Sequence, residues 1–241
     1  MATTKKTAQA EATQVITIKP IKTVSTEITI VGDTPLIIHA WSEKAKKEML
    51  EAQQKAKKDK KAKAIRDPFA EFMDALYWVT PKPEEHTPEA YEEALRNGAK
   101  FGFPVIAIKL AALAACYRAG IIPNQVGMKT HFFLNAAEGV SQDNGLELAV
   151  IDTDEPPILR EDMVKIGGIS KTADLRYRPA FNNWKMRLKV TMVDTGTFTM
   201  DSIINGINMA GFMNGLGEWR MEKNGDFGRF HVQLDNEGEE A

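Results

Sequence analysis

The segment Trp184–Val193 (WKMRLKVTMV) constrains the fold most strongly, because apolar and polar side chains alternate along its whole length. Its apolar side chains fall on one face, namely Met186, Leu188, Val190 and Met192. Its basic side chains fall on the other, namely Lys185, Arg187 and Lys189. A period of two residues is typical of a β-strand with one buried face. The sequence therefore predicts a strand at 184–193.

Two apolar segments predict helices. Ile108–Ala119 (IKLAALAACYRA) is expected to be a buried helix that Gly120 closes at the C′ position. Met200–Phe212 (MDSIINGINMAGF) is expected to be a second helix. Further strands are predicted at Thr26–Val31, Leu146–Ile151 and Gly228–Leu234.

The order of these elements indicates the fold class. When residues 42–102 are set aside as an insertion, the order is strand, helix, strand, strand, helix, strand. That is the split βαβ arrangement. The predicted fold is therefore α+β, with a ferredoxin-like (RRM-type) β-α-β-β-α-β core, a helical insertion at 42–102 and a thumb-like excursion at 152–183. We expect a single domain at 15–234, preceded by a disordered arm at 1–14 and followed by an acidic tail at 235–241.

Composition and charge are those of an ordinary globular protein. The 241 residues are 43% hydrophobic and 27% charged, so a core can be buried without disulfides or metal. The net charge of −2 argues against a uniformly basic binder, and any basic surface has to be local. The single cysteine, Cys116, allows no internal disulfide and suits a reducing cytoplasm. Because Cys116 lies among alanines in an apolar segment, we expect a small buried side chain rather than a catalytic thiol.

The N-terminal residues predict no targeting to a membrane. Met1–Thr13 lacks the apolar region of a signal peptide. No window approaches the ~20 consecutive apolar residues that a membrane span needs. The sequence therefore predicts a cytoplasmic protein with no membrane partner.

The insertion begins with a lysine-rich segment, Ser42–Ile65, made mostly of strong helix formers. Its apolar residues are too few for a full core-facing stripe. Three interpretations stay open: a solvated surface helix, an arm that neutralises phosphates, and a membrane-surface helix. Shorter helices are predicted at Phe69–Val79 and Pro88–Asn97.

The most distinctive segment is Gly211–Phe230 (GFMNGLGEWRMEKNGDFGRF), which we call the glycine-rich loop. Glycines let the backbone approach a ligand closely, and exposed amides beside a helix form a concave anion site. The interspersed arginines and aromatic rings suit phosphates and bases respectively. The alternative is a long connection whose glycines only make turns. No Gly-Lys-[Ser/Thr] triplet of a nucleotide-binding P-loop follows a strand here.

Three segments resemble motifs of the RAMP superfamily, the RRM-like proteins that coat guide RNA in CRISPR effectors. GLGEWRMEKNGDFGRFHV is similar to that family's C-terminal glycine-rich loop and last strand. VGDTPLII, residues 31–38, is similar to its first strand and following turn. FPVIAIKLA, residues 103–111, is similar to its entry into the first helix, with Lys109 at the family's lysine.

The resemblance implies a backbone subunit of the CRISPR Cascade type, or a phage-encoded relative that works in the bacterial cytoplasm. Such proteins bind RNA through the sheet and the helix entry, insert a thumb-like hairpin between bases, and polymerise side by side. The segment Glu155–Phe181 is the candidate thumb, with Lys165, Lys171, Arg176, Tyr177 and Arg178 as a lining for a single strand. The alternative is a solvated basic loop.

Signals for catalysis are scarce. The histidines His39, His86, His131 and His231 lack the spacing of metal ligands. No motif of a serine hydrolase, a zinc protease or a thiol redox enzyme is present. We expect neither enzymatic activity nor a metal or other cofactor. An endoribonuclease of the RAMP type, using His39, Asp162 or Asp174, stays as an alternative.

The predicted function is non-catalytic binding of single-stranded nucleic acid, either RNA or DNA, by a homo-oligomer or filament that other effector subunits can join. A self-assembling structural protein of the phage type, without nucleic acid, is the other alternative. The predicted nucleic-acid contacts are Lys109, Lys165, Lys171, Arg176, Tyr177, Arg178, Gly215, Gly217, Trp219, Arg220, Lys223, Gly225, Gly228 and Arg229.

Overall fold

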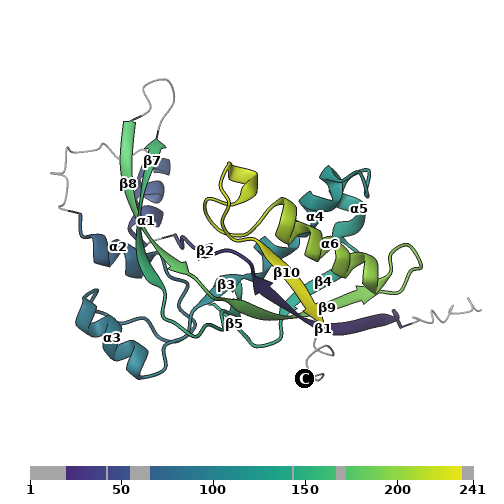
Figure 1. Ribbon diagram of the computed structural model, residues 1–241, viewed down its shortest axis with the longest axis horizontal. Coiled ribbons are helices and arrows are strands. Elements are labelled where there is room, and N and C mark those ends of the chain that lie inside the picture. Colours follow the sequence, from purple (N-terminus) through teal and green to yellow (C-terminus); the bar gives the residue numbers. More distant parts are fainter. Residues whose placement is uncertain (1–19, 42, 55–65, 143, 167–171, 235–241) are drawn as a thin grey trace, which may run out of the picture.

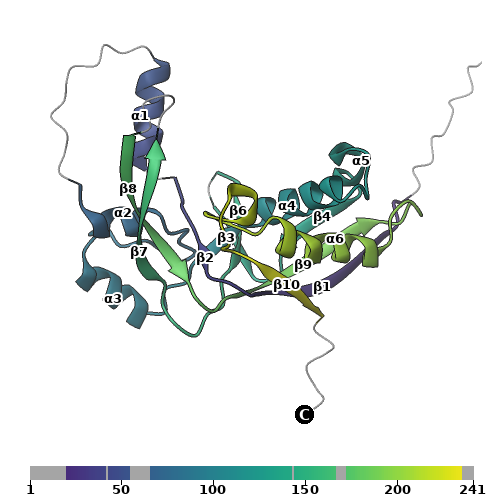
Figure 2. The ribbon, with the colours of Figure 1, turned by 45° about the horizontal axis from the view of Figure 1, so that its top comes forward.

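The main sheet of the computed structural model has four antiparallel strands in the order β10-β1-β9-β4 (Figure 1). The structure describes residues 20–41, 43–54, 66–142, 144–166 and 172–234. The strands are β1 (Thr23–Gly32), β4 (Phe132–Ala136), β9 (Lys185–Val193) and β10 (Phe230–Leu234). Two helices, α4 (Val105–Arg118) and α6 (Met200–Met213), lie together on one face of this sheet (Figure 2). The fold is α+β with antiparallel sheets, as predicted.

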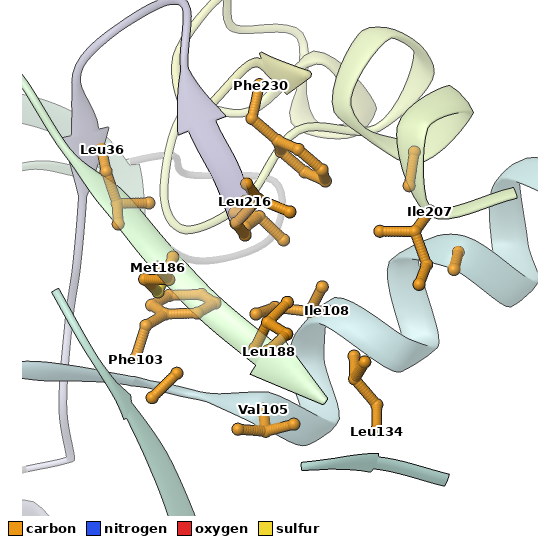
Figure 3. Close-up of a cluster of buried hydrophobic side chains, with 14 of the residues drawn as sticks. Leu36, Phe103, Val105, Ile108, Leu134, Met186, Leu188, Ile207, Leu216 and Phe230 are labelled. Carbon is orange, nitrogen blue, oxygen red and sulfur yellow. The ribbon is translucent and has the colours of Figure 1, made fainter. Parts of the chain in front are cut away.

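The alternation along β9 is confirmed. Met186, Leu188, Val190 and Met192 are buried, whereas Lys185, Arg187 and Lys189 are exposed. The buried residues of β9 meet Ile108 from α4 and Ile207 from α6, and Leu216 of the glycine-rich loop inserts beside them (Figure 3). The loop is therefore anchored in the core by one apolar side chain.

Both predicted core helices are present. Helix α4 begins three residues before the predicted start, and Gly120 follows its C-cap with a positive φ of 71°, as expected of a C′ glycine. Thr199 caps α6 through a reciprocal capping box with Ser202. Cys116 is buried where α4 meets α6, and a Cβ atom added to Gly206 would lie 2.7 Å from its Sγ atom. The cysteine is a packing residue, as predicted.

The second strand of the main sheet is not the predicted one. Leu146–Ile151 contains β6 (Glu147–Val150), which lies in a separate sheet with β3 (Gly102–Pro104) and β5 (Gly139–Ser141). Strand β4 instead pairs with β9 in the main sheet, within a region that was predicted to consist of loops. Phe132 and Leu134 are the buried residues of β4, and Ala136 packs against the core as a small, partly buried side chain, so the apolar signal of this strand is short.

The insertion forms α1 (Glu43–Gln53), α2 (Pro68–Asp74) and α3 (Pro88–Arg96). The prediction for α3 is confirmed, while α2 ends well before Val79. Trp78 leaves the helix direction because its indole donates to the Met73 carbonyl and its backbone bridges Phe101. The later part of the lysine-rich segment, 55–65, lies outside the described residues.

The predicted excursion is a long hairpin that stands away from the main sheet, with α1 beside it (Figures 1 and 2). It consists of β7 (Ile158–Ile166) and β8 (Thr172–Phe181), and the short strand β2 (Leu36–Ile37) pairs with the base of β8. None of the helices in the described ranges is long and apolar enough to cross a membrane.

Candidate functional site

A groove of about 480 Å³ lies between the start of α4 and the glycine-rich loop. We call it the central groove. One wall comes from Phe103, Pro104, Ala107 and Leu110, the other from the loop, and His39 and Tyr77 line the same groove. Figure 1 shows the loop, in yellow, between the hairpin and α4. The two segments that resemble the helix entry and the glycine-rich loop therefore meet at one groove.

The glycines of the loop allow its backbone to pack closely against neighbouring carbonyl groups. Gly217 has a φ of 72°, and a Cβ atom there would overlap the Ile37 carbonyl. Gly228 has a φ of 68°, and a Cβ atom there would overlap the Leu216 carbonyl. Neither position tolerates a side chain without movement, because the loop folds tightly on itself and on β2.

The loop amides are mostly occupied, which differs from the expected bare anion cradle. Gly215 donates to Ala210, Glu218 to Ile37, and Gly228 to Pro35, at 2.8 to 2.9 Å. Gly225 donates to the Arg220 carbonyl at 3.1 Å. The expectation that the loop presents unpaired amides to a polymer is wrong at these positions, because intramolecular carbonyls already accept from them. The alternative in which the glycines make turns describes the backbone better.

The loop cations pair with carboxylates. Both Arg220 and Arg118 donate to Glu222, and these bonds lower the pKa of the Glu222 carboxyl. Arg220 also donates to the Gly217 carbonyl at 2.8 Å. Arg229 lies 3.3 Å from Asp226. Lys223 is exposed, with no ion pair to any described residue. A phosphate would have to displace carboxylates from the arginines.

Trp219 is not a free stacking platform. It is half-buried, and its φ of 50° is unusual for a side chain of this size. Its indole nitrogen is buried and finds no acceptor in the described part of the chain. The neighbouring Phe227 ring is covered by Arg160, whose guanidinium carbon lies 4.6 Å from the ring centre.

Arg178 of the hairpin links β8 to the glycine-rich loop. It is only 7% exposed, with Asp162 of β7 at 3.7 Å and Glu218 of the loop at 3.5 Å. Arg160 lies 2.8 Å from the same Asp162. Arg178 Nε and Asp162 Oδ2 are buried without hydrogen-bond partners within the described ranges. We call these four residues, with Trp219, the charged corner.

The remaining hairpin candidates divide between two faces. Arg176 shares the face of Arg178, because alternate strand residues point the same way, and it lies 2.9 Å from Asp174. Tyr177 points to the other face, where the Arg66 guanidinium lies over its ring. Lys165 is exposed on β7, and Lys171 lies outside the described residues. A single lining of Arg176, Tyr177 and Arg178 is therefore not formed.

Lys109 is not part of the central groove. It donates to the Phe132 carbonyl at 2.6 Å and lies 4.7 Å from the centre of the Phe132 ring. Burial, and then the nearby Lys129, lower the pKa of its ammonium group. This lysine therefore ties α4 to the edge strand β4.

His39 lies at the end of the central groove nearest the charged corner. Burial lowers the pKa of its imidazole, and the positive charge of Arg178 lowers it further, so the ring is neutral at pH 7. Across the described ranges, no group of three or more His, Cys, Asp or Glu side chains is arranged to hold a metal ion.

Several residues that line the central groove were not predicted from the sequence. Tyr77, Asn214, Glu218 and Glu222 line the groove, and none of them was predicted. The two glutamates had a visible signal, since both lie inside the glycine-rich loop beside its arginines. In comparisons with known proteins, no family model matches this chain, and no curated protein is significantly similar to it.

Proposed function

We propose that this protein binds single-stranded nucleic acid along the central groove and the charged corner, without catalysing a reaction. The observation that carries the proposal is the meeting of three segments that are far apart in sequence. The helix entry at Phe103–Pro104 and the glycine-rich loop line one groove, and the hairpin reaches the loop through Arg178.

The polar groups of this region favour a ligand. Three buried side-chain atoms lack hydrogen-bond partners in the described residues, and all belong to the charged corner: Asp162 Oδ2, Arg178 Nε and Trp219 Nε1. Buried groups of this kind are uncommon and concentrate at functional sites. Arginine suits phosphate, because its planar fork binds two oxygens at once.

The carboxylates that pair with the arginines should reduce the affinity for nucleic acid. Glu218 and Glu222 neutralise much of the arginine charge, which fits the net charge of −2 for the chain. A phosphate strand has to compete with these carboxylates. We therefore expect moderate affinity that falls as salt rises, rather than the tight binding of a strongly basic protein.

We further propose a ferredoxin-like core and a distant relationship to the RAMP superfamily. The strand order β10-β1-β9-β4, all antiparallel, with α4 after β1 and α6 after β9, supports the core topology. The relationship rests on the three quoted segments, which form the end of β1 with β2, the start of α4, and the loop with β10.

Fluorescence anisotropy of a labelled 30-mer tests the function. RNA and DNA single strands and a duplex are titrated with the full chain at several salt concentrations. We expect single strands to bind better than the duplex, with log affinity falling by ~0.7 per log salt for each phosphate neutralised. No binding, or affinity independent of salt, would refute the proposal.

Charge variants locate the site. Arg220→Gln and Lys223→Gln should each weaken binding about threefold to tenfold, the effect of losing one phosphate contact. Arg96→Gln is the matched control, because Arg96 is exposed on α3 and pairs only at 4.0 Å with Glu92 among the described residues. Equal losses in all three variants would place the binding surface elsewhere.

Self-assembly is the second candidate function, and exposed apolar side chains favour it. Ile106, Leu110 and Tyr117 form an exposed stripe along α4, while Leu159, Met163 and Leu175 share one face of the hairpin. Large exposed apolar patches mark interaction surfaces. Light scattering after size-exclusion chromatography, with and without nuclease treatment, separates the two candidates. Regular assemblies that contain no nucleic acid would favour the structural role.

A further inference from the structure

A second groove lies next to the central groove and shares one residue with it. It has a volume of about 490 Å³, and Tyr77 lines both grooves. Its other lining residues belong to the segment just before the insertion, to the insertion itself and to the loop before β6, among them Trp41, Lys46, Trp78, Gln142 and Asn144. Tyr77 therefore stands in the wall of both grooves, which lie side by side.

Trp41 is the exposed aromatic residue of this second groove. It is 62% exposed, whereas Trp78 and Trp184 are 8% and 3% exposed. Its backbone is held in place, because the preceding Ala40 amide donates to the Ala75 carbonyl at the end of α2 at 2.8 Å. Tryptophan is a large apolar side chain, so one that stands open beside a groove on an anchored stretch of backbone points to a ligand with a flat apolar face.

The surroundings of Trp41 add polar edges to this flat surface. The side-chain amides of Gln142 and Asn144 carry donors and acceptors, and the Asn144 oxygen already accepts from the Leu146 amide at 2.9 Å. Tyr77 keeps its hydroxyl proton, because burial and the negative Glu218 raise the pKa of the phenol. Flat apolar surface with amide and hydroxyl edges is the combination that accepts a nucleobase.

We propose that a single strand leaving the central groove passes Tyr77 and stacks a base on Trp41. This inference rests on the proposed function and assigns the stacking role to Trp41, in place of Trp219 and Tyr177. The phosphates lie along the arginines of the central groove, and the bases next along the strand occupy the second groove. Stacking on an aromatic ring accepts any base, so this site confers no strong sequence preference.

Binding of oligonucleotides to Trp41→Ala and Trp41→Phe tests the inference. Loss of one stacked base weakens binding about tenfold in Trp41→Ala, and Trp41→Phe recovers most of the affinity. Tryptophan fluorescence is a second measurement, since a base stacked on an exposed indole quenches its emission. Oligonucleotide should quench the wild type strongly, and either variant much less.

Phe133→Ala is the matched control. Phe133 is also 62% exposed, but it lies on β4 and lines neither groove. This variant should bind like the wild type. If the wild type binds single strands and Trp41→Ala binds equally well with unchanged quenching, the inference is wrong and the proposed function stands. If the wild type binds no single strand, both are wrong.

Discussion

Strands β8 and β9 follow one another in the chain and have nearly equal lengths, ten and nine residues, yet they are buried by different means. Strand β9 points Met186, Leu188, Val190 and Met192 into an apolar core. Strand β8 buries an arginine, Arg178, between two carboxylates. Burial of an apolar side chain stabilises a fold without any hydrogen bond or ion pair. A buried charge stays favourable only while oppositely charged or hydrogen-bonding groups surround it. The contrast indicates that the apolar face of β9 stabilises the fold. The buried Arg178 of β8 depends on its carboxylate partners, which a ligand could replace.

The largest effect is expected for Leu188→Ala in β9. Leu188 is fully buried, so the lost apolar contacts and the cavity should reduce the free energy of unfolding by about 3 to 4 kcal/mol. Lys189→Ala, the next residue and exposed, should change it by less than about 0.5 kcal/mol. Urea denaturation measures both. If both variants lost similar free energies of unfolding, the two faces of β9 would not differ in their contribution to stability.

Arg178→Met probes the charged burial of β8. Removing Arg178 leaves Arg160 as the remaining cation of the buried Asp162 and takes the ion pair away from Glu218, which should reduce the free energy of unfolding by about 2 to 3 kcal/mol. The double variant Asp162→Leu with Arg178→Met should regain most of that loss, because apolar residues often replace a buried ion pair without penalty. Urea denaturation checks this cycle. A double variant as unstable as the two single changes combined would mean that Asp162 and Arg178 do not stabilise one another.

Gly217→Ala tests whether the glycine-rich loop is built by packing. Its positive φ and the overlap with the Ile37 carbonyl should together reduce the free energy of unfolding by about 2 kcal/mol. Gly98→Ala is the control, since Gly98 has a φ of 79° and nothing within 4 Å of an added Cβ atom. The free energy of unfolding of Gly98→Ala should fall by about 1 kcal/mol, which is the cost of the positive φ for alanine without any steric overlap. Thermal and urea denaturation report the difference, and equal losses would remove the packing argument.

The smallest effect is expected from pH and His39. Because burial lowers its pKa in the folded state, the unfolded chain binds the proton more readily. Stability contributed by neutral His39 is present above pH 6.5 and is lost as the pH falls below that value. His39→Gln should make the free energy of unfolding less dependent on pH between 7 and 5. An NMR titration of the His39 ring gives its pKa directly, and a value above 6.5 would contradict this account.

The sequence predicted the elements whose pattern is local. Alternation identified β9, and apolar composition with Gly120 identified α4 and its end. It missed β4, because two inward residues give too short a signal, and it placed 146–151 in the wrong sheet, because strand pairing depends on tertiary contacts. The charges of the site were visible in the sequence, but their partners were not. Arg178 and Glu218 are 40 residues apart along the chain, and only the fold brings them within 3.5 Å.

The bond from the Glu218 amide to the Ile37 carbonyl has a mechanical consequence. Ile37 belongs to β2, and β2 pairs with β8, so the glycine-rich loop is coupled through the main chain to the base of the hairpin. A displacement of the loop at Glu218 would therefore pull on β2 and, through it, on the base of the hairpin. The same loop is also tied to α4, because Arg118 donates to Glu222 and the Asn214 side chain donates to the Ala111 carbonyl at 3.1 Å, so the loop joins both walls of the groove.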